Sequence, residues 1–201
     1  MGRYVALLRG INVGGKNLIR MADLKACFQE NGFEDATTYI QSGNVIFGSG
    51  ESNLSELTDR IERMLAANFD YEARVVLRSR KHMRSIVERA PTDFGDDATR
   101  YRYDVIFLKS PLTARTAMRS VLTKKGVDRA HAGSGVLYFS RLTSRATQSR
   151  LSRIASMPVY QSMTIRNWNT TTKLLLLLEP QRIERPLSSE GDRLRHRPGS
   201  R

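Results

Sequence analysis

Cysteine and clustered metal ligands are scarce in this chain. It has 201 residues and a single cysteine, Cys27, so it forms no intramolecular disulfide. Its three histidines lie far apart, and neither an H-E-x-x-H nor a C-x-x-C motif occurs, so we expect no metal site. The nucleophile motif G-x-S-x-G of α/β-hydrolases is absent as well.

Long apolar runs are also missing. The runs at 4–8 and 174–178 have five residues each, whereas a membrane-spanning helix needs about 20. The first of these runs is interrupted by Arg9 and does not make a secretory signal. We therefore expect a cytoplasmic protein with no membrane partner.

Acidic residues are fewer than basic ones, with 20 aspartates and glutamates against 33 lysines and arginines, and the net charge is +13. Residues 179–201 hold six arginines and four acids, so we interpret most of the excess as spread through the folded part. Spread charge often serves solubility alone. It also suits nucleic acid, an anionic lipid surface or a phosphorylated small molecule as a partner. Both interpretations stay open at this stage.

Short apolar runs alternate with helical periodicities along the chain. In the first half we expect strands at 4–9, 37–41, 45–47 and 73–78, with helices at 20–31, after Asn53 and at 82–90. A polar, acidic linker follows at 92–100. In the second half we expect strands at 103–108, near 127, at 136–139 and at 163–166, with helices at 114–122, 148–156 and 169–178.

Each half therefore has the order β-α-β-β-α-β plus one trailing helix. This order predicts an α+β protein with two tandem ferredoxin-like (βαββαβ) subdomains. We expect the first repeat, with a ligand loop, over residues 1–91, the second over 101–178, and a mobile basic tail over 179–201. A single mixed sheet with helices on its faces is the alternative.

A glycine-rich loop follows the first predicted strand. It nearly fits the phosphate-binding motif G-x-x-x-x-G-K-[ST], but Asn17 replaces the hydroxyl residue that would bind magnesium. A looser anion pocket is thus favoured over nucleotide hydrolysis. The alternative is a wide turn with a solvated lysine. The loop residues that we expect at a ligand are Arg9, Gly10, Asn12, Gly14, Gly15, Lys16 and Asn17.

A polar hairpin, Gln41-Ser42-Gly43-Asn44, follows the second predicted strand. A right-handed crossover makes the first two strands parallel, so their carboxyl ends lie at the same edge of the sheet. The loop and the side chains of Gln41, Ser42 and Asn44 are therefore expected to share one site. Ordinary turn chemistry explains the hairpin equally well.

The third motif, Arg166-Asn167-Trp168-Asn169, begins the last predicted helix, with Asn169 as the expected N-cap. An arginine beside a helix N-terminus attracts anions, which makes Arg166, Asn167 and Trp168 further candidates. A core position for Trp168 is the alternative.

Together, the runs 4–17, 39–47 and 164–174 resemble the bacterial domain-of-unknown-function family numbered 1697. The resemblance covers about residues 3 to 178 and implies an α+β fold with two ferredoxin-like subdomains. It implies no activity, and any cofactor is unknown. Ser149-Arg150-Leu151 looks like the family's Ser-Lys-Leu element with arginine for lysine, and Thr171 stands where an apolar residue is usual.

These patterns favour a protein that binds a small anionic or phosphorylated ligand, with no general base in evidence and catalysis left open. The alternative is an RNA- or DNA-binding module, because the RNA-recognition domain has the same element order. That domain stacks bases on aromatic residues of its sheet, whereas the strand at 45–47 has only one, and Tyr138 and Phe139 point to opposite faces. A purely structural, partner-binding role has no feature for or against it.

Overall fold

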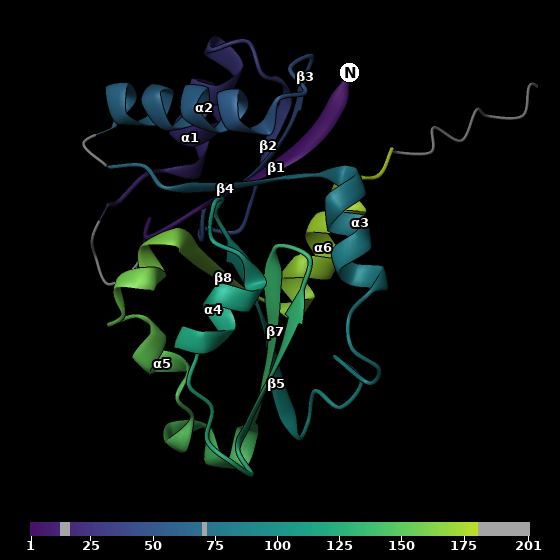
Figure 1. Ribbon diagram of the computed structural model, residues 1–201. Helices are drawn as coiled ribbons and strands as arrows, with labels where there is room; N and C mark the ends of the chain where they lie inside the picture. Colours follow the sequence, from purple (N-terminus) through teal and green to yellow (C-terminus); the bar gives the residue numbers. More distant parts are fainter. Residues whose placement is uncertain (13–16, 70–71, 181–201) are drawn as a thin grey trace, which may run out of the picture.

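The computed structural model describes residues 1–12, 17–69 and 72–180 (Figure 1). Gly14, Gly15 and Lys16 of the predicted ligand loop lie outside the described residues, and so do residues 181–201 of the predicted tail.

The first subdomain contains one four-stranded antiparallel sheet in the order β2-β3-β1-β4. Its elements are β1 (Gly2–Leu8), α1 (Met21–Glu30), β2 (Glu34–Tyr39), β3 (Asn44–Ser49), α2 (Leu54–Asn68), β4 (Val75–Ser79) and the trailing helix α3 (Arg80–Glu88). Asn53 caps α2, because its Oδ1 accepts from the backbone N of Ser55 at 3.0 Å.

The second subdomain repeats this plan, with the sheet order β6-β7-β5-β8. Its elements are β5 (Tyr101–Leu108), α4 (Ala114–Ser120), β6 (Asp128–Gly133), β7 (Val136–Leu142), the 3₁₀ helix η1 (Thr143–Gln148), α5 (Leu151–Ile154), the 3₁₀ helix η2 (Pro158–Ser162), β8 (Met163–Asn167) and the trailing helix α6 (Trp168–Leu178). The predicted fold class, two tandem ferredoxin-like subdomains, is confirmed.

The expected helix at 148–156 is the largest local difference. Only Leu151–Ile154 is α-helical, because the chain before it forms η1 and Pro158 starts η2. Two buried side chains, Leu151 and Ile154, hold this single turn against the second sheet.

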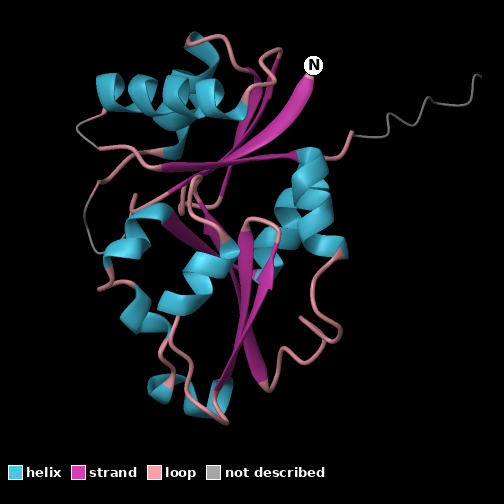
Figure 2. Cartoon of the chain, in the orientation of Figure 1, coloured by secondary structure: helices cyan, strands magenta, loops and turns pink. Residues whose placement is uncertain are grey.

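Three layers of core run through the molecule. Helices α1 and α2 cover one face of the first sheet, and α4 and α5 cover one face of the second (Figures 1 and 2). The remaining faces of both sheets meet α3 and α6 in one shared core, which includes Val5, Leu7, Ile46, Val76, Met83, Ile86, Val105, Phe107, Val136, Tyr138, Leu174 and Leu178. The trailing helices α3 and α6 thus pack against both sheets and join the two subdomains through this core.

This shared core removes the sheet surface that an RNA-recognition domain uses. Tyr138 is 2% exposed, and its hydroxyl donates to the carbonyl of Ile86 on α3 at 2.7 Å. Phe139 is buried under the helices on the other face. Bases have no open sheet face in the described structure on which to stack.

His82 on α3 contacts the second subdomain. Its Nε2 lies 2.9 Å from the carbonyl O of Ser134 in the β6–β7 hairpin. Burial lowers the pKa of His82, the hydrogen bond to Ser134 opposes this shift, and the positive charge of Arg78 adds to it.

We expect acid to weaken the fold through His82. Below the ordinary histidine pKa of about 6.5, the unfolded chain takes up a proton before the folded chain does, so stability falls as the pH falls. Urea unfolding at neutral and mildly acidic pH should show a smaller loss for His82→Gln than for the native chain. Equal losses in the two proteins would contradict this expectation.

Candidate functional site

The loop after β1 and the β2–β3 hairpin lie together at one edge of the first sheet. Strands β1 and β2 run in the same direction, since each is antiparallel to β3. The backbone N of Leu8 donates to the carbonyl of Gly43 at 2.8 Å, and Asn12 Nδ2 donates to the carbonyl of Gln41 at 3.0 Å. We call residues 8–12 and 41–44 the corner.

Two asparagines hold the ends of the glycine-rich loop. Asn12 has a φ of 53°, and its Oδ1 accepts from the backbone N of Ile19 at 2.9 Å. Asn17 has a φ of 50° and donates from Nδ2 to the carbonyl of Gly10 at 2.9 Å. Asparagine tolerates this left-handed region better than most residues. Both side chains therefore bond to backbone groups: that of Asn17 within the loop, and that of Asn12 to Ile19 and to the hairpin residue Gln41.

The hairpin is tightly packed beneath its surface. Asn44 is fully buried and donates from Nδ2 to the carbonyl of Tyr39 at 2.9 Å and to Ser42 Oγ at 3.0 Å. Ser42 is half-buried, whereas Gln41 is exposed. Of the three predicted hairpin side chains, only that of Gln41 lies mainly in solvent.

Arg166 reaches the corner from β8 of the second subdomain. It is 7% exposed, and its Nε donates to Asn44 Oδ1 at 2.6 Å. Its Nη2 donates to the carbonyls of Leu8 and Ser42, each at 2.8 Å, and its Nη1 donates to Thr164 Oγ1 at 2.8 Å. The Arg166 guanidinium thus bonds to neutral oxygens of the first strand and of the hairpin, and it brings together residues of the three runs 4–17, 39–47 and 164–174.

Asn167 and Trp168 line a different hollow of about 310 Å³, together with Asp104 and Arg141. Asn167, two residues before the expected Asn169, caps α6, because its Oδ1 accepts from the backbone N of Thr170 at 2.7 Å. Burial raises the pKa of the Asp104 carboxyl, and the nearby charges of Arg141 and Arg102 oppose this shift.

Trp168 packs edge-to-face on Phe94, with ring centroids 5.1 Å apart. It lies partly buried against the shared core between the subdomains. The contacts of Trp168 thus match the alternative of a core position, and Trp168 also lines the hollow that includes Asp104.

Arg78 on β4 is the counterpart of Arg166, and sequence reasoning missed it. Its Nη2 donates to the carbonyls of Leu108 and Gly135, both at 2.7 Å, in the second subdomain. It is 7% exposed, and burial lowers its pKa to about 10. Leu108 also donates from its backbone N to Gly135 at 3.0 Å, as Leu8 does to Gly43.

Each subdomain therefore contributes one arginine to the other. Arg78 on β4 and Arg166 on β8 each donate to the first strand and to the hairpin of the opposite subdomain. The sequence does carry a signal for this exchange: a Ser-Gly pair stands in both hairpins, at Ser42-Gly43 and Ser134-Gly135, and an arginine stands in both fourth strands.

The next residue after each first strand also contacts the opposite half. The Arg9 guanidinium lies 4.7 Å from the ring centroid of Tyr160. Lys109, at the equivalent position, forms an ion pair with Glu62 on α2. Arg9, which is part of the corner, thus lies at the contact between the subdomains.

A hollow of about 390 Å³ opens beside the corner, lined by Asn12, Leu18, Ile19, Arg20, Met21 and Gln41. Arg20 is mostly exposed, and its guanidinium forms a bidentate ion pair with Asp23, in which Nε donates to Oδ2 at 2.7 Å and Nη2 donates to Oδ1 at 3.0 Å. The hollow therefore combines one guanidinium, two amide side chains and three apolar side chains.

The comparisons with known proteins agree with this architecture. The model of the family described as "Protein of unknown function (DUF1697)" matches residues 1–138. The conserved bacterial protein SP0830 from Streptococcus pneumoniae is 26% identical and superposes with a TM-score of 0.78, covering 89% of this chain and 99% of that chain. No curated protein matches the sequence. Every helix among the described residues is too short or too polar to cross a bilayer. The chain belongs to the DUF1697 family.

Proposed function

We propose that this protein binds a small anionic ligand in the hollow beside the corner. The observation that carries this proposal is the position of the hollow, at the edge where the carboxyl ends of β1 and β2 meet, with the exposed guanidinium of Arg20 in its wall. Cationic and amide donors at such a place suit a carboxylate or a phosphate ester.

The size of the hollow restricts the ligand. About 390 Å³ lies near the lower end of the range for small-molecule sites. A monophosphate or a short dicarboxylate fits this volume, and the apolar side chains of Leu18, Ile19 and Met21 favour a ligand with a small hydrophobic part.

Three polar residues at the corner, two of them buried, serve this site by positioning. Asn12, Asn44 and Arg166 direct their polar atoms to other protein atoms, so they fix the loop and the hairpin in place. Direct contact falls to Arg20 and Gln41. Gly14, Gly15 and Lys16 are candidates on sequence grounds.

Binding is favoured over catalysis. The described residues that line the hollow include no carboxylate, imidazole or thiol. A general acid or base would need one of these groups or a similar one.

We expect Arg20→Gln to weaken ligand binding by at least about tenfold, because a hydrogen bond to a charged group contributes about 1.5–3 kcal/mol and about 1.4 kcal/mol is a factor of ten. Thermal shift with a panel of inorganic phosphate, nucleoside monophosphates and dicarboxylates identifies the ligand, and titration gives the affinities. Lys25→Gln is the matched control, since it removes the same charge from the exposed surface of the adjacent helix α1.

If the ligand-induced thermal shift were lost in both Arg20→Gln and Lys25→Gln, or in neither, the assignment of the ligand to this hollow would be contradicted. Lys16→Ala tests the sequence-based part of the site separately. A panel in which no anion raises the melting temperature of the native chain would refute the proposed function itself.

A further inference from the structure

The positive charge is concentrated in one subdomain, contrary to the even spread expected above. Residues 101–180 contain 13 lysines and arginines against three acids, whereas residues 1–100 contain 14 of each. The first subdomain is therefore close to neutral, and the excess charge of the described chain belongs to the second.

None of the three acids of residues 101–180 forms a salt bridge with Arg115, Arg119, Lys124, Arg145, Arg150 or Arg153 within the described residues, although the buried Asp128 bonds to the backbones of Lys124 and Arg150. Asp104 pairs with Arg141 at 3.2 Å, and Glu179 pairs with Arg84 on α3 at 2.8 Å. Asp128 is 6% exposed, and its Oδ2 accepts from the backbone N of Lys124 at 3.0 Å and of Arg150 at 2.9 Å.

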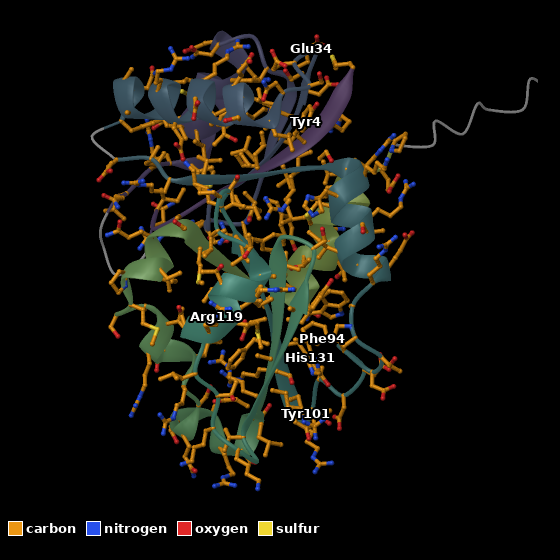
Figure 3. The ribbon with its side chains drawn as sticks, viewed as in Figure 1. Tyr4, Glu34, Phe94, Tyr101, Arg119 and His131 are labelled. Carbon is orange, nitrogen blue, oxygen red and sulfur yellow. The ribbon has the colours of Figure 1, made fainter. Side chains whose placement is uncertain are left out.

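The helices and loops on the outer side of the second sheet carry a cationic surface, which we call the basic face. Figure 3 labels Arg119 on α4, whereas the labelled Phe94 belongs to the shared core on the other side of this sheet. The members of the basic face are Arg115, Arg119, Lys124, Arg145, Arg150 and Arg153. None of them forms a salt bridge within the described residues.

The centre of this face brings like charges together. Lys124 Nζ and an Arg145 Nη2 donate to the same oxygen, Gln148 Oε1, at 3.0 and 2.9 Å. Asp128 holds the backbones of Lys124 and Arg150 side by side. Two cations within two hydrogen-bond lengths repel each other, and a bound polyanion would relieve this repulsion.

We propose that the basic face binds the phosphodiester backbone of a nucleic-acid duplex. Five of its six cations are arginines, whose planar forks match phosphate oxygens. The segments 114–127 and 143–156 contain no aromatic residue, so they offer no stacking platform for unpaired bases. Backbone contact without stacking is typical of duplex binding that is insensitive to sequence.

A lipid surface suits this face less well. Binding to a bilayer interface needs an apolar side that enters the membrane. The large exposed hydrophobic side chain in these segments is Leu122 alone, at 41% exposure. The face is thus charged without being amphipathic.

The test compares two triple variants of the full chain by fluorescence anisotropy. The first, Lys124→Gln with Arg145→Gln and Arg150→Gln, neutralises the centre of the basic face. The matched control, Lys25→Gln with Arg63→Gln and Lys81→Gln, removes the same charge from exposed positions of the first subdomain. The probes are labelled DNA and RNA duplexes, single strands of the same sequences, and vesicles containing phosphatidylserine.

We expect the native chain to bind duplexes with an affinity that falls steeply with salt. The first triple variant should weaken binding at least about tenfold at 0.1 M salt and reduce the slope of log K against log [salt] by about 3, because each lost phosphate contact removes about 0.9 from the slope. The control should change the affinity less than about threefold by this account, since it leaves all phosphate contacts in place.

Arg115→Gln with Arg119→Gln provides a second variant at exposed positions of α4, should the triple variant lose its fold. Equal weakening by both triple variants would overturn the proposal, because net charge alone would then act. Tighter binding of single strands or vesicles than of duplexes would also overturn it, as would no duplex binding at low salt. Arg20→Gln should leave duplex binding unchanged, which separates this surface from the small-ligand hollow.

Discussion

Replacing Arg166 with methionine is expected to lower the free energy of unfolding by about 3–5 kcal/mol, because three acceptors lose this donor at a cost of about 1–3 kcal/mol each. The change removes the hydrogen-bond donor of the fully buried Asn44 Oδ1 and leaves the carbonyls of Leu8 and Ser42 without this partner. Buried acceptors that lose their donors cost much more than a surface hydrogen bond contributes. Methionine fills most of the volume, so the loss reports on polar contacts.

Urea unfolding, followed by circular dichroism and by the fluorescence of Trp168, measures this effect. Arg166→Lys should restore only a small part of the stability, because an ammonium group lacks the fork that spans Asn44 and two carbonyls. Arg153→Met, at an exposed position, is the matched control and should stay within about 0.5 kcal/mol of the native chain. A loss below about 1 kcal/mol for Arg166→Met would show that the contact contributes little.

Replacing Gly43 with alanine is expected to cost about 3 kcal/mol by two separate effects. Gly43 has a φ of 72°, where a side chain is strained. An added Cβ would also lie 2.7 Å from Ile11 Cδ1 and 2.9 Å from Leu8 Cβ, so buried side chains must move.

Gly10→Ala separates the two effects. Gly10 has the same φ of 72°, but an added Cβ meets nothing within 4 Å. We therefore expect a cost of about 1 kcal/mol from strain alone. Equal costs at Gly10 and Gly43 would show that the close packing of the hairpin against Ile11 does not limit the residue at position 43.

Much of the architecture could be predicted from local patterns. The repeated order of strands and helices depends on apolar periodicity, and the crossover rule then predicts that Asn12 and the Gln41–Asn44 hairpin share an edge. The short α5 could not be predicted in this way, because its periodic residues Leu151 and Ile154 also suit one isolated turn held by the sheet.

The side-chain partners at the corner depend on long-range contacts that no local pattern contains. Arg166 and Asn44 are 122 residues apart in the chain, and their hydrogen bond exists only because β8 meets the β2–β3 hairpin across the subdomain contact. The same motif residues that predict a ligand are also the residues that fix the corner. Polar composition alone does not distinguish a positioning asparagine, such as Asn12, from one that contacts a ligand.

The exchanged arginines have a consequence for any shortened form of this protein. A chain ending after α3 would keep Arg78 but lose the carbonyls of Leu108 and Gly135 that accept from it, and it would expose the apolar residues of the first sheet and of α3 that pack against the second subdomain. Such a fragment could satisfy these groups by pairing with a second copy of itself around a twofold axis. The two subdomains of this chain are thus joined much as the two subunits of such a twofold dimer would be.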